Sequence, residues 1–304
     1  RDRHKMEPIF EGTGVALVLP MFEDGSIDYE GYKRQVQRMI DGGVKALLVN
    51  GTTGEPATID IEDEFELTKI TVEMAKGTGV KVIVGAGSNY TAQAIRKAKF
   101  NAEAGADANL VVTPYYNKTS QRGLIEHYKA VAAASDLPLI MYNVPGRTGM
   151  KISVDTVVEL AKVPNIVAMK DATDDIAYAM EVLTRTKDMD FDLYSGCDDN
   201  ILPFIAAGGK GVISVLSNLY PRETEMFAQA ALKGDLELAR KMAYDLNDVS
   251  KYLFIDVNPI MPKAALKHMG VIESDMLRQP LIPTTEENKK LLFDAMKEFE
   301  SKGY

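Results

Sequence analysis

Short apolar runs rich in β-branched residues recur at intervals of roughly 20–35 residues, and a segment with helical spacing follows each of them. The runs are continuous rather than alternating, which is typical of strands covered on both faces of a parallel sheet. They span residues 15–19, 46–49, 80–84, 110–113, 139–142, 166–170, 191–195 and 211–215. Eight parallel strands close a sheet into a barrel. The pattern therefore predicts an α/β fold, a (β/α)8 TIM barrel.

Helix start and stop signals support this alternation. The segment 28–41 ends at Gly42-Gly43, a strong C-terminal stop, and the segment 91–104 begins with Thr91 in the position of an N-cap. Ser153 stands in the same position ahead of residues 154–161. An open doubly wound sheet is the competing architecture. It usually carries a phosphate-binding glycine loop after its first strand, where this chain has Leu19-Pro20-Met21.

After the eighth run the pattern becomes purely helical, with segments at 223–232, 236–252, 262–269 and 285–301. One of these predicts the last barrel helix, and the others predict a C-terminal helical extension. We therefore divide the chain into a barrel at 7–235 and an extension at 236–304. Residues 1–6 are charged and have no apolar stretch behind them, so we interpret them as an added segment ahead of a natural start at Met6.

Composition narrows the function classes. The formal charge of −9 and the absence of Lys and Arg clusters argue against a nucleic-acid partner. No apolar run approaches the ~20 residues that span a bilayer, so no membrane partner is expected. The single cysteine, Cys197, excludes an internal disulfide framework and predicts a cytoplasmic protein. Three scattered histidines make a histidine-rich metal site improbable, and neither a metal nor a cofactor is expected.

In such a barrel the chemistry belongs to the carboxyl ends of the strands. The second run is followed by Gly51-Thr52-Thr53-Gly54-Glu55. Glycines there let backbone N–H groups approach an anion, and two hydroxyls can bind a carboxylate or relay a proton. A tight turn whose threonines only cap the next helix explains the same residues. The glycine-rich segment 85–89 lacks the further signals of a nucleotide loop and favours a structural turn.

Two further strand ends carry polar groups. Tyr115 and Tyr116 follow the fourth run, where a phenol can donate or accept a proton, and where aromatic rings can equally pack at a subunit interface. Arg147 follows the fifth run in a turn shaped by Pro145 and Gly146. Its planar fork suits a carboxylate, although it can also hold the loop through backbone carbonyls.

Lys170 ends the sixth run and gives the sharpest signal. A lysine at the end of a buried strand is costly unless it is paired or neutral, and desolvation favours the neutral amine that attacks a carbonyl carbon. A structural lysine paired with Asp171 or Asp174 is the alternative. Cys197, after the seventh run, is interpreted as a small packing residue, because no histidine accompanies it in the sequence.

Taken together, these loops resemble the dihydrodipicolinate synthase family within the pyruvate-dependent class I aldolase superfamily. The likeness rests on residues 51–55, 142–148 and Lys170, is extended by 113–117, 208–215 and 258–260, and runs from about Pro8 to the end of the chain. The resemblance implies a Schiff-base-forming lyase that condenses pyruvate with L-aspartate-4-semialdehyde without a cofactor or metal. The product feeds diaminopimelate and lysine biosynthesis.

The resemblance also implies catalytic roles. Lys170 would form the imine with pyruvate, and Tyr142 beside it would act as the proton shuttle. Thr53 would link Tyr142 to Tyr116 of a neighbouring subunit. A dimer that shares Tyr116 is therefore the smallest complete unit, and a homotetramer of two such dimers is the form that the family implies.

Substrate-binding roles follow in the same way. Thr52 and Thr53 would hold the pyruvate carboxylate, and Arg147 would bind the carboxylate of the second substrate. Gly196 and Ile213 would line the pocket. N-acetylneuraminate lyases in the superfamily usually have Ser-Thr in place of Thr52-Thr53 and no arginine at the position of Arg147. Such a lyase or another 2-keto acid (2-keto-3-deoxy sugar acid) aldolase is the runner-up, and a non-catalytic keto-acid sensor is an alternative of another class.

The chain departs from the family pattern at a few positions, namely Leu19, Asp174, Cys197 and Met261-Pro262. None of them belongs to the implied proton relay, although Asp174 and Cys197 can change the shape of the pocket.

A lysine effector site is expected to be vestigial. Ile61, Glu64 and Gln93 stand where lysine-sensitive relatives have histidines and a glutamate, while Asn89 and Tyr115 are retained. Inhibition by lysine is therefore expected to be weak or absent.

Overall fold

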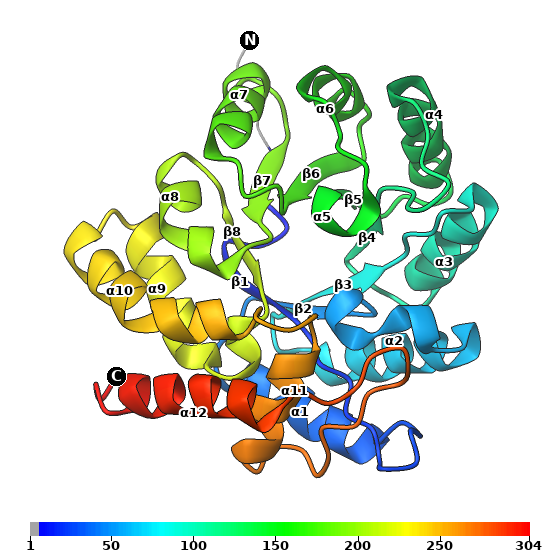
Figure 1. The fold of residues 1–304 in the computed structure, drawn as a ribbon. Helices are drawn as coiled ribbons and strands as arrows, with labels where there is room; N and C mark the ends of the chain where they lie inside the picture. The colour runs from blue at the N-terminus through cyan, green and yellow to red at the C-terminus, as the bar shows by residue number, and fades with distance from the viewer. Residues whose placement is uncertain (1–5) are drawn as a thin grey trace.

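A computed structural model describes residues 6–304, so the segment expected at 1–6 lies outside the described residues except for Met6. Eight parallel strands form a closed barrel in sequence order, which confirms the predicted (β/α)8 TIM barrel. Figure 1 shows the helices arranged around these strands. The strands are β1 (Gly12–Ala16), β2 (Ala46–Val49), β3 (Lys81–Gly85), β4 (Ala108–Val112), β5 (Leu139–Asn143), β6 (Ile166–Asp171), β7 (Asp192–Ser195) and β8 (Gly211–Ser214).

The first strand differs from the prediction: it spans Gly12–Ala16, whereas the apolar run lies at 15–19. Neighbouring side chains leave little room for a side chain at Gly12 or Gly14. In particular, a side chain on Gly211 would collide with the backbone of Gly12, its partner across the β1–β8 pairing. Because glycine adds no apolar signal, the apolar pattern did not reveal where this strand begins. The apolar residues 17–19 are buried as well, but they belong to the loop that follows β1.

The helices of the barrel are α1 (Tyr29–Asp41), α2 (Ile61–Ala75), α3 (Thr91–Glu103), α4 (Gln121–Ala132), α5 (Pro145–Thr148), α6 (Val154–Ala161), α7 (Ile176–Thr186), α8 (Ile201–Ala206) and α9 (Pro221–Leu232). Ser153 caps α6 as predicted, because its side chain accepts a hydrogen bond from the Thr156 N–H. The prediction for Thr91 is wrong. Tyr90 occupies the cap position, and the Thr91 hydroxyl lies 2.9 Å from Nδ1 of His127 instead.

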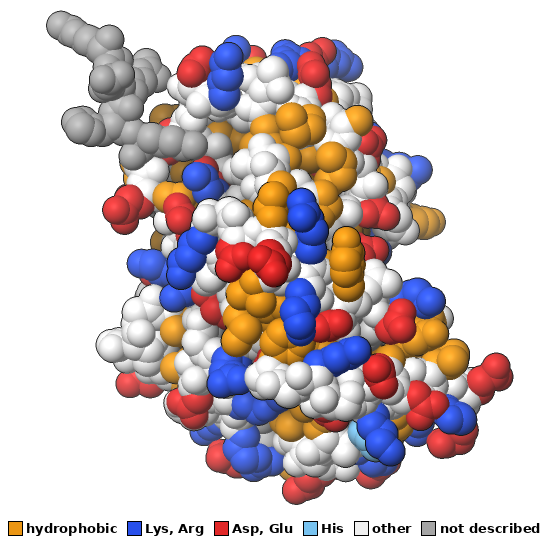
Figure 2. Space-filling model, turned by 90° about the vertical axis from the view of Figure 1, so that its left-hand side faces the viewer, with side chains coloured by type: hydrophobic (Ala, Val, Ile, Leu, Met, Phe, Trp, Pro, Cys, Tyr) orange, Lys and Arg blue, Asp and Glu red, His pale blue; other side chains and the backbone are white. Residues whose placement is uncertain are grey.

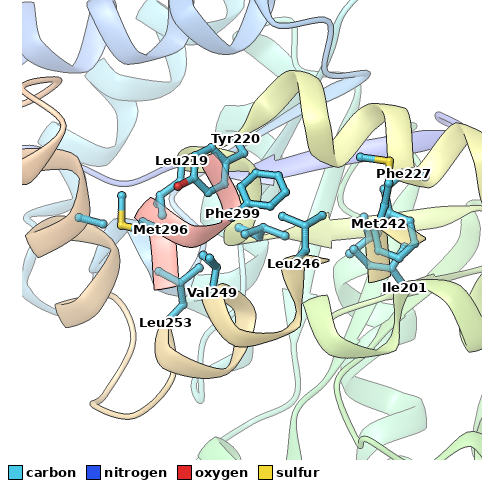
Figure 3. Packing of buried hydrophobic residues seen from close by; sticks show 14 of the residues in the cluster. Ile201, Leu219, Tyr220, Phe227, Met242, Leu246, Val249, Leu253, Met296 and Phe299 are labelled. Carbon is cyan, nitrogen blue, oxygen red and sulfur yellow. The ribbon is translucent and has the colours of Figure 1, made fainter. Parts of the chain in front are cut away.

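The C-terminal extension consists of α10 (Leu236–Tyr252), α11 (Ile260–His268) and α12 (Glu286–Glu300). Met242, Leu246, Val249 and Leu253 recur every three or four residues along α10 and its C-cap, and so form one buried stripe. Figure 3 shows this stripe against side chains of α9 and α12, among them Phe227 and Phe299. Each large side chain buried there contributes about 1.5–3 kcal/mol. The extension is therefore packed firmly on the barrel.

The outer side of the molecule near α8, α9 and α10 carries lysine and arginine side chains interspersed with aspartate and glutamate (Figure 2). This face therefore offers no extended basic surface of the kind that binds nucleic acid. Among the described residues, none of the helices combines the length and the apolar character needed to cross a bilayer.

A buried ion pair joins the extension to the loop after β2. Nζ of Lys263 on α11 lies 2.6 Å from Oε2 of Glu55, and the two side chains are 0% and 2% exposed. The same ammonium donates to the carbonyl of Met276. Burial lowers the pKa of Lys263, and the Glu55 carboxylate opposes that shift. Arg278, farther along the extension, donates to the carbonyl of Thr58. Contacts with the C-terminal extension thus fix the loop 51–55 in place.

Replacing Lys263 with Met is expected to lower the free energy of unfolding by about 3–5 kcal/mol, because it leaves the Glu55 carboxylate buried without its partner. Urea unfolding followed by circular dichroism measures the change. The double variant with Glu55→Gln is the matched control, and it should recover most of the loss because neither buried charge remains. Equal loss in both variants would contradict this account.

Candidate active site

Lys170 and Tyr142 occupy facing positions on neighbouring strands. They are paired in register between β6 and β5, and Nζ of Lys170 lies 4.1 Å from the centre of the Tyr142 ring. Both side chains are buried, Lys170 being 6% exposed. Within residues 6–304 no carboxylate forms an ion pair with Lys170. The Asp171 carboxylate instead accepts hydrogen bonds from the backbone and hydroxyl of Thr173. The salt-bridge alternative therefore has no support.

Gly196 makes room for the lysine. A Cβ at this position would lie 3.2 Å from Cε of Lys170 and 2.9 Å from Cβ of Ala172, so a larger residue would press on the amine. Ile213 on β8 belongs to the same interior apolar cluster as Tyr142. The loop that carries Gly196 is held by the buried Asp198, whose carboxylate accepts hydrogen bonds from the Ser214 hydroxyl and the Val215 N–H.

The two threonines after β2 have different surroundings. Thr52 lines a cavity that Tyr142 also lines. Thr53 is more deeply buried, and its hydroxyl accepts a hydrogen bond of 2.9 Å from Nδ2 of Asn258 in the extension. Thr52, to which the resemblance assigns no part in the proton relay, is therefore the threonine that lines the cavity.

Arg147 lies on α5, just beyond the end of β5, and lines the same cavity. Its Nη2 donates to the backbone carbonyl of Asn258 at 3.0 Å. Arg147 therefore does bind a backbone carbonyl, which was the alternative to carboxylate binding that its sequence context offered. It uses one of five N–H groups, so the guanidinium keeps donors for a carboxylate.

The cavity has a volume of about 420 Å³, which suits a small molecule. Its walls come from the ends of β2–β5 and from the extension, together with Tyr115 after β4, Glu64 on α2 and Lys97 on α3. Lys170 is not among the residues that line this cavity, but its Nζ lies 4.1 Å from the centre of the Tyr142 ring, which does line it. In the sequence, residues 258–260 stand out only as one of the segments that resemble the dihydrodipicolinate synthases. The sequence did not predict that Asn258 would contact both Thr53 and Arg147.

Comparisons with known proteins agree with this arrangement. The model of the dihydrodipicolinate synthetase family matches residues 9–299. The chain belongs to that family. A 4-hydroxy-tetrahydrodipicolinate synthase of Exiguobacterium sibiricum is 44% identical over 291 residues, which cover 96% of this chain and 98% of the relative.

Two solved structures of dihydrodipicolinate synthases superpose with TM-scores of 0.93. One, from Acinetobacter baumannii, is described as complexed with pyruvate; it is 38% identical and covers 96% of this chain and 99% of its own. The other is described as a monomeric variant; it is 39% identical and covers 96% of this chain and 97% of its own. Family membership thus leaves the number of subunits open.

Tyr116 is not part of the site within one chain of this dihydrodipicolinate synthetase family member. It is 91% exposed and adopts a left-handed backbone conformation with φ of 70°, while its neighbour Tyr115 lines the cavity. Asn117 donates to the backbone carbonyl of Asn89 and so ties this loop to the loop after β3. The tyrosine that the resemblance gives to a second subunit therefore projects away from its own barrel.

Glu64 and Lys97 form an ion pair of 3.1 Å at the wall of the cavity, with side chains 5% and 15% exposed. Burial raises the pKa of the Glu64 carboxyl, and Lys97 opposes the shift. Tyr115, which the family pattern retains, lines the same cavity. A cation of the protein itself therefore lies in the region assigned to the vestigial effector site.

The two departures Asp174 and Cys197 come together in space. Their donor atoms and that of Asp199 all lie within 4.8 Å of one another, and Nδ2 of Asn200 donates to Asp174. Burial, and next the nearby carboxylates of Asp199 and Asp174, raise the pKa of the Cys197 thiol to about 12. The thiol is therefore protonated at neutral pH, and it is no nucleophile for the reaction.

We expect Cys197 to react with iodoacetamide at pH 8 at least roughly tenfold more slowly than free cysteine, because only the thiolate reacts. The rate should keep rising above pH 10, as the thiolate forms only near the raised pKa. Cys197 is the only cysteine, so the mass of the intact protein measures the modification. Asp199→Asn should accelerate the reaction by removing a repelling charge. Rapid modification of the folded wild-type protein at pH 8 would contradict this expectation.

Proposed function

We propose that this protein is a 4-hydroxy-tetrahydrodipicolinate synthase, which condenses pyruvate with L-aspartate-4-semialdehyde through a lysine imine. The observation that carries the proposal is the buried Lys170, which forms no ion pair within residues 6–304 and lies against the ring of Tyr142, in a chain of the dihydrodipicolinate synthetase family. The pyruvate-bound relative of 38% identity supports pyruvate as the first substrate. A cytoplasmic location, expected from the single cysteine, suits such a biosynthetic reaction.

In the first step the Nζ lone pair of Lys170 attacks C2 of pyruvate. Proton transfer and loss of the former carbonyl oxygen as water then give the imine. We assign the transfer of these protons to Tyr142, and the contact between its ring and the amine supports this role. The relay role that the resemblance gives to Thr53 suits Thr52 better, because Thr52 lines the cavity together with Tyr142.

In the second step the former methyl group of pyruvate loses a proton, and the resulting enamine attacks the aldehyde carbon. The amine of the second substrate then replaces Lys170 at C2, which closes the ring and frees the lysine. Arg147 is the cation on the cavity wall that suits the carboxylate of this substrate. The residual N–H groups left by its bond to Asn258 provide that contact.

We further propose that the working form is at least a dimer, in which Tyr116 of one chain completes the proton relay of the other. Support comes from the almost complete exposure of Tyr116 beside the cavity residue Tyr115. An exposed aromatic ring of this size is typical of a subunit contact. A tetramer remains the expectation from the resemblance.

Incubation with pyruvate and borohydride is expected to fix a reduced pyruvate adduct on Lys170, which peptide mass spectrometry locates. Lys170→Met abolishes the adduct because no amine remains. Tyr142→Phe retains the ring but lowers turnover by roughly 10²–10⁴-fold, since proton transfer is lost. Wild-type protein without an adduct at Lys170 would refute the imine mechanism.

Turnover assays separate the synthase from the runner-up aldolase. L-aspartate-4-semialdehyde should be consumed with pyruvate, whereas N-acetylmannosamine should not. Arg147→Ala is expected to raise KM for the semialdehyde roughly tenfold or more, because a carboxylate loses a charged hydrogen-bond partner. Faster turnover with the sugar would favour the lyase instead.

Lysine at sub-millimolar concentration should leave the activity unchanged, because the Lys97 ammonium already pairs with Glu64 at the expected effector site and would repel a second cation. Initial rates over a lysine titration measure this. Lys97→Met is the informative comparison, as it leaves Glu64 without its cation. Half-maximal inhibition of the wild type at sub-millimolar lysine would contradict the proposal.

A further inference from the structure

Asn258 is the residue through which the extension reaches the reaction site. It lies between α10 and α11, is 8% exposed and lines the cavity. Its side-chain Nδ2 donates to the Thr53 hydroxyl at 2.9 Å, and its backbone carbonyl accepts from Arg147 at 3.0 Å. One residue therefore contacts both groups that are expected to hold the substrates' carboxylates.

The bond to Thr53 has a direction, and that direction has a chemical consequence. A hydroxyl carries one hydrogen and two lone pairs. When the amide N–H of Asn258 donates to Oγ1 of Thr53, a lone pair is used and the hydrogen remains free for another acceptor. Among the described residues no hydrogen bond donated by this hydroxyl is found. A carboxylate bound against the Thr53 side chain would therefore meet an O–H donor.

The reverse orientation of the Asn258 amide would change this outcome. Oδ1 would then face Thr53 and take its hydrogen, so the hydroxyl would have no donor left for a substrate. Such a rotation would also place the two N–H donors of the amide where Oδ1 is now buried without a partner among residues 6–304. Burying two unsatisfied donors costs more than burying one unsatisfied acceptor. The observed orientation is the favoured one.

We propose that Asn258 is a positioning residue, which holds the Thr53 hydroxyl as a hydrogen-bond donor to the carboxylate of pyruvate and fixes Arg147 for the second substrate through its main-chain carbonyl. This inference rests on the proposed function. The two contacts differ in kind, since one uses the side chain and the other the main chain. Side-chain variants therefore act on pyruvate and largely spare the semialdehyde.

The test is Asn258→Asp, which keeps the size of the side chain but leaves it only acceptor oxygens, so that Thr53 must donate to it. The concentration of pyruvate that gives half-maximal borohydride trapping on Lys170 is expected to rise roughly tenfold or more, as a hydrogen bond to a charged group is lost. KM for L-aspartate-4-semialdehyde should change much less. An unchanged trapping midpoint, or equal changes for both substrates, would overturn the proposal.

A double-variant cycle with Thr53→Val separates hydrogen bonding from simple charge repulsion. If Asn258 acts through the hydroxyl, Asn258→Asp adds little to the effect of Thr53→Val. If the new carboxylate only repels pyruvate, the two effects multiply and the proposal fails. Asn258→Ala serves if the aspartate variant does not fold: it should also raise the trapping midpoint more than the semialdehyde KM. A wild-type protein that traps no pyruvate at all would instead refute the proposed function.

Discussion

The buried ion pair between Glu55 and Lys263 is the constraint on which the arrangement of the site depends. A lysine and a glutamate that are removed from water this completely are stable only when they are held against each other. The pair therefore forces α11 to lie over the loop 51–55, although 208 positions of sequence separate the two residues (263 − 55). The C-terminal extension is consequently part of the site and not an appendage to a finished barrel.

With α11 fixed, the segment just before it reaches the mouth of the barrel. Asn258 contacts Thr53 and Arg147 there, which come from the ends of β2 and β5. On the other side, Gly196 leaves space for Lys170, and Asp198 holds the loop that carries that glycine. The amine of Lys170 is thus buried against the ring of Tyr142, and Thr52 and Arg147 line the cavity that this ring also lines.

Much of this architecture could be predicted from the chain because the relevant signals are local. Seven of the eight apolar runs located their strands, and Ser153 located the start of a helix. The first strand was misplaced, since Gly12 and Gly14 meet a steric demand of the β1–β8 pairing and add no apolar signal. Thr91 does not cap its helix, and its hydroxyl instead forms a hydrogen bond with His127, 36 residues away. Both errors arose where a distant contact overrode a local preference.

The sequence by itself determined the barrel, the lysine at the end of its sixth strand and the likeness to the dihydrodipicolinate synthases. Each depends on residue type and order along one segment. Only the tertiary structure decided that Lys170 forms no ion pair among the described residues, that Thr52 lines the cavity while the Thr53 hydroxyl bonds to Asn258, and that Lys97 pairs with Glu64. These facts depend on which side chains meet across the fold. The pattern of a single segment does not contain that information.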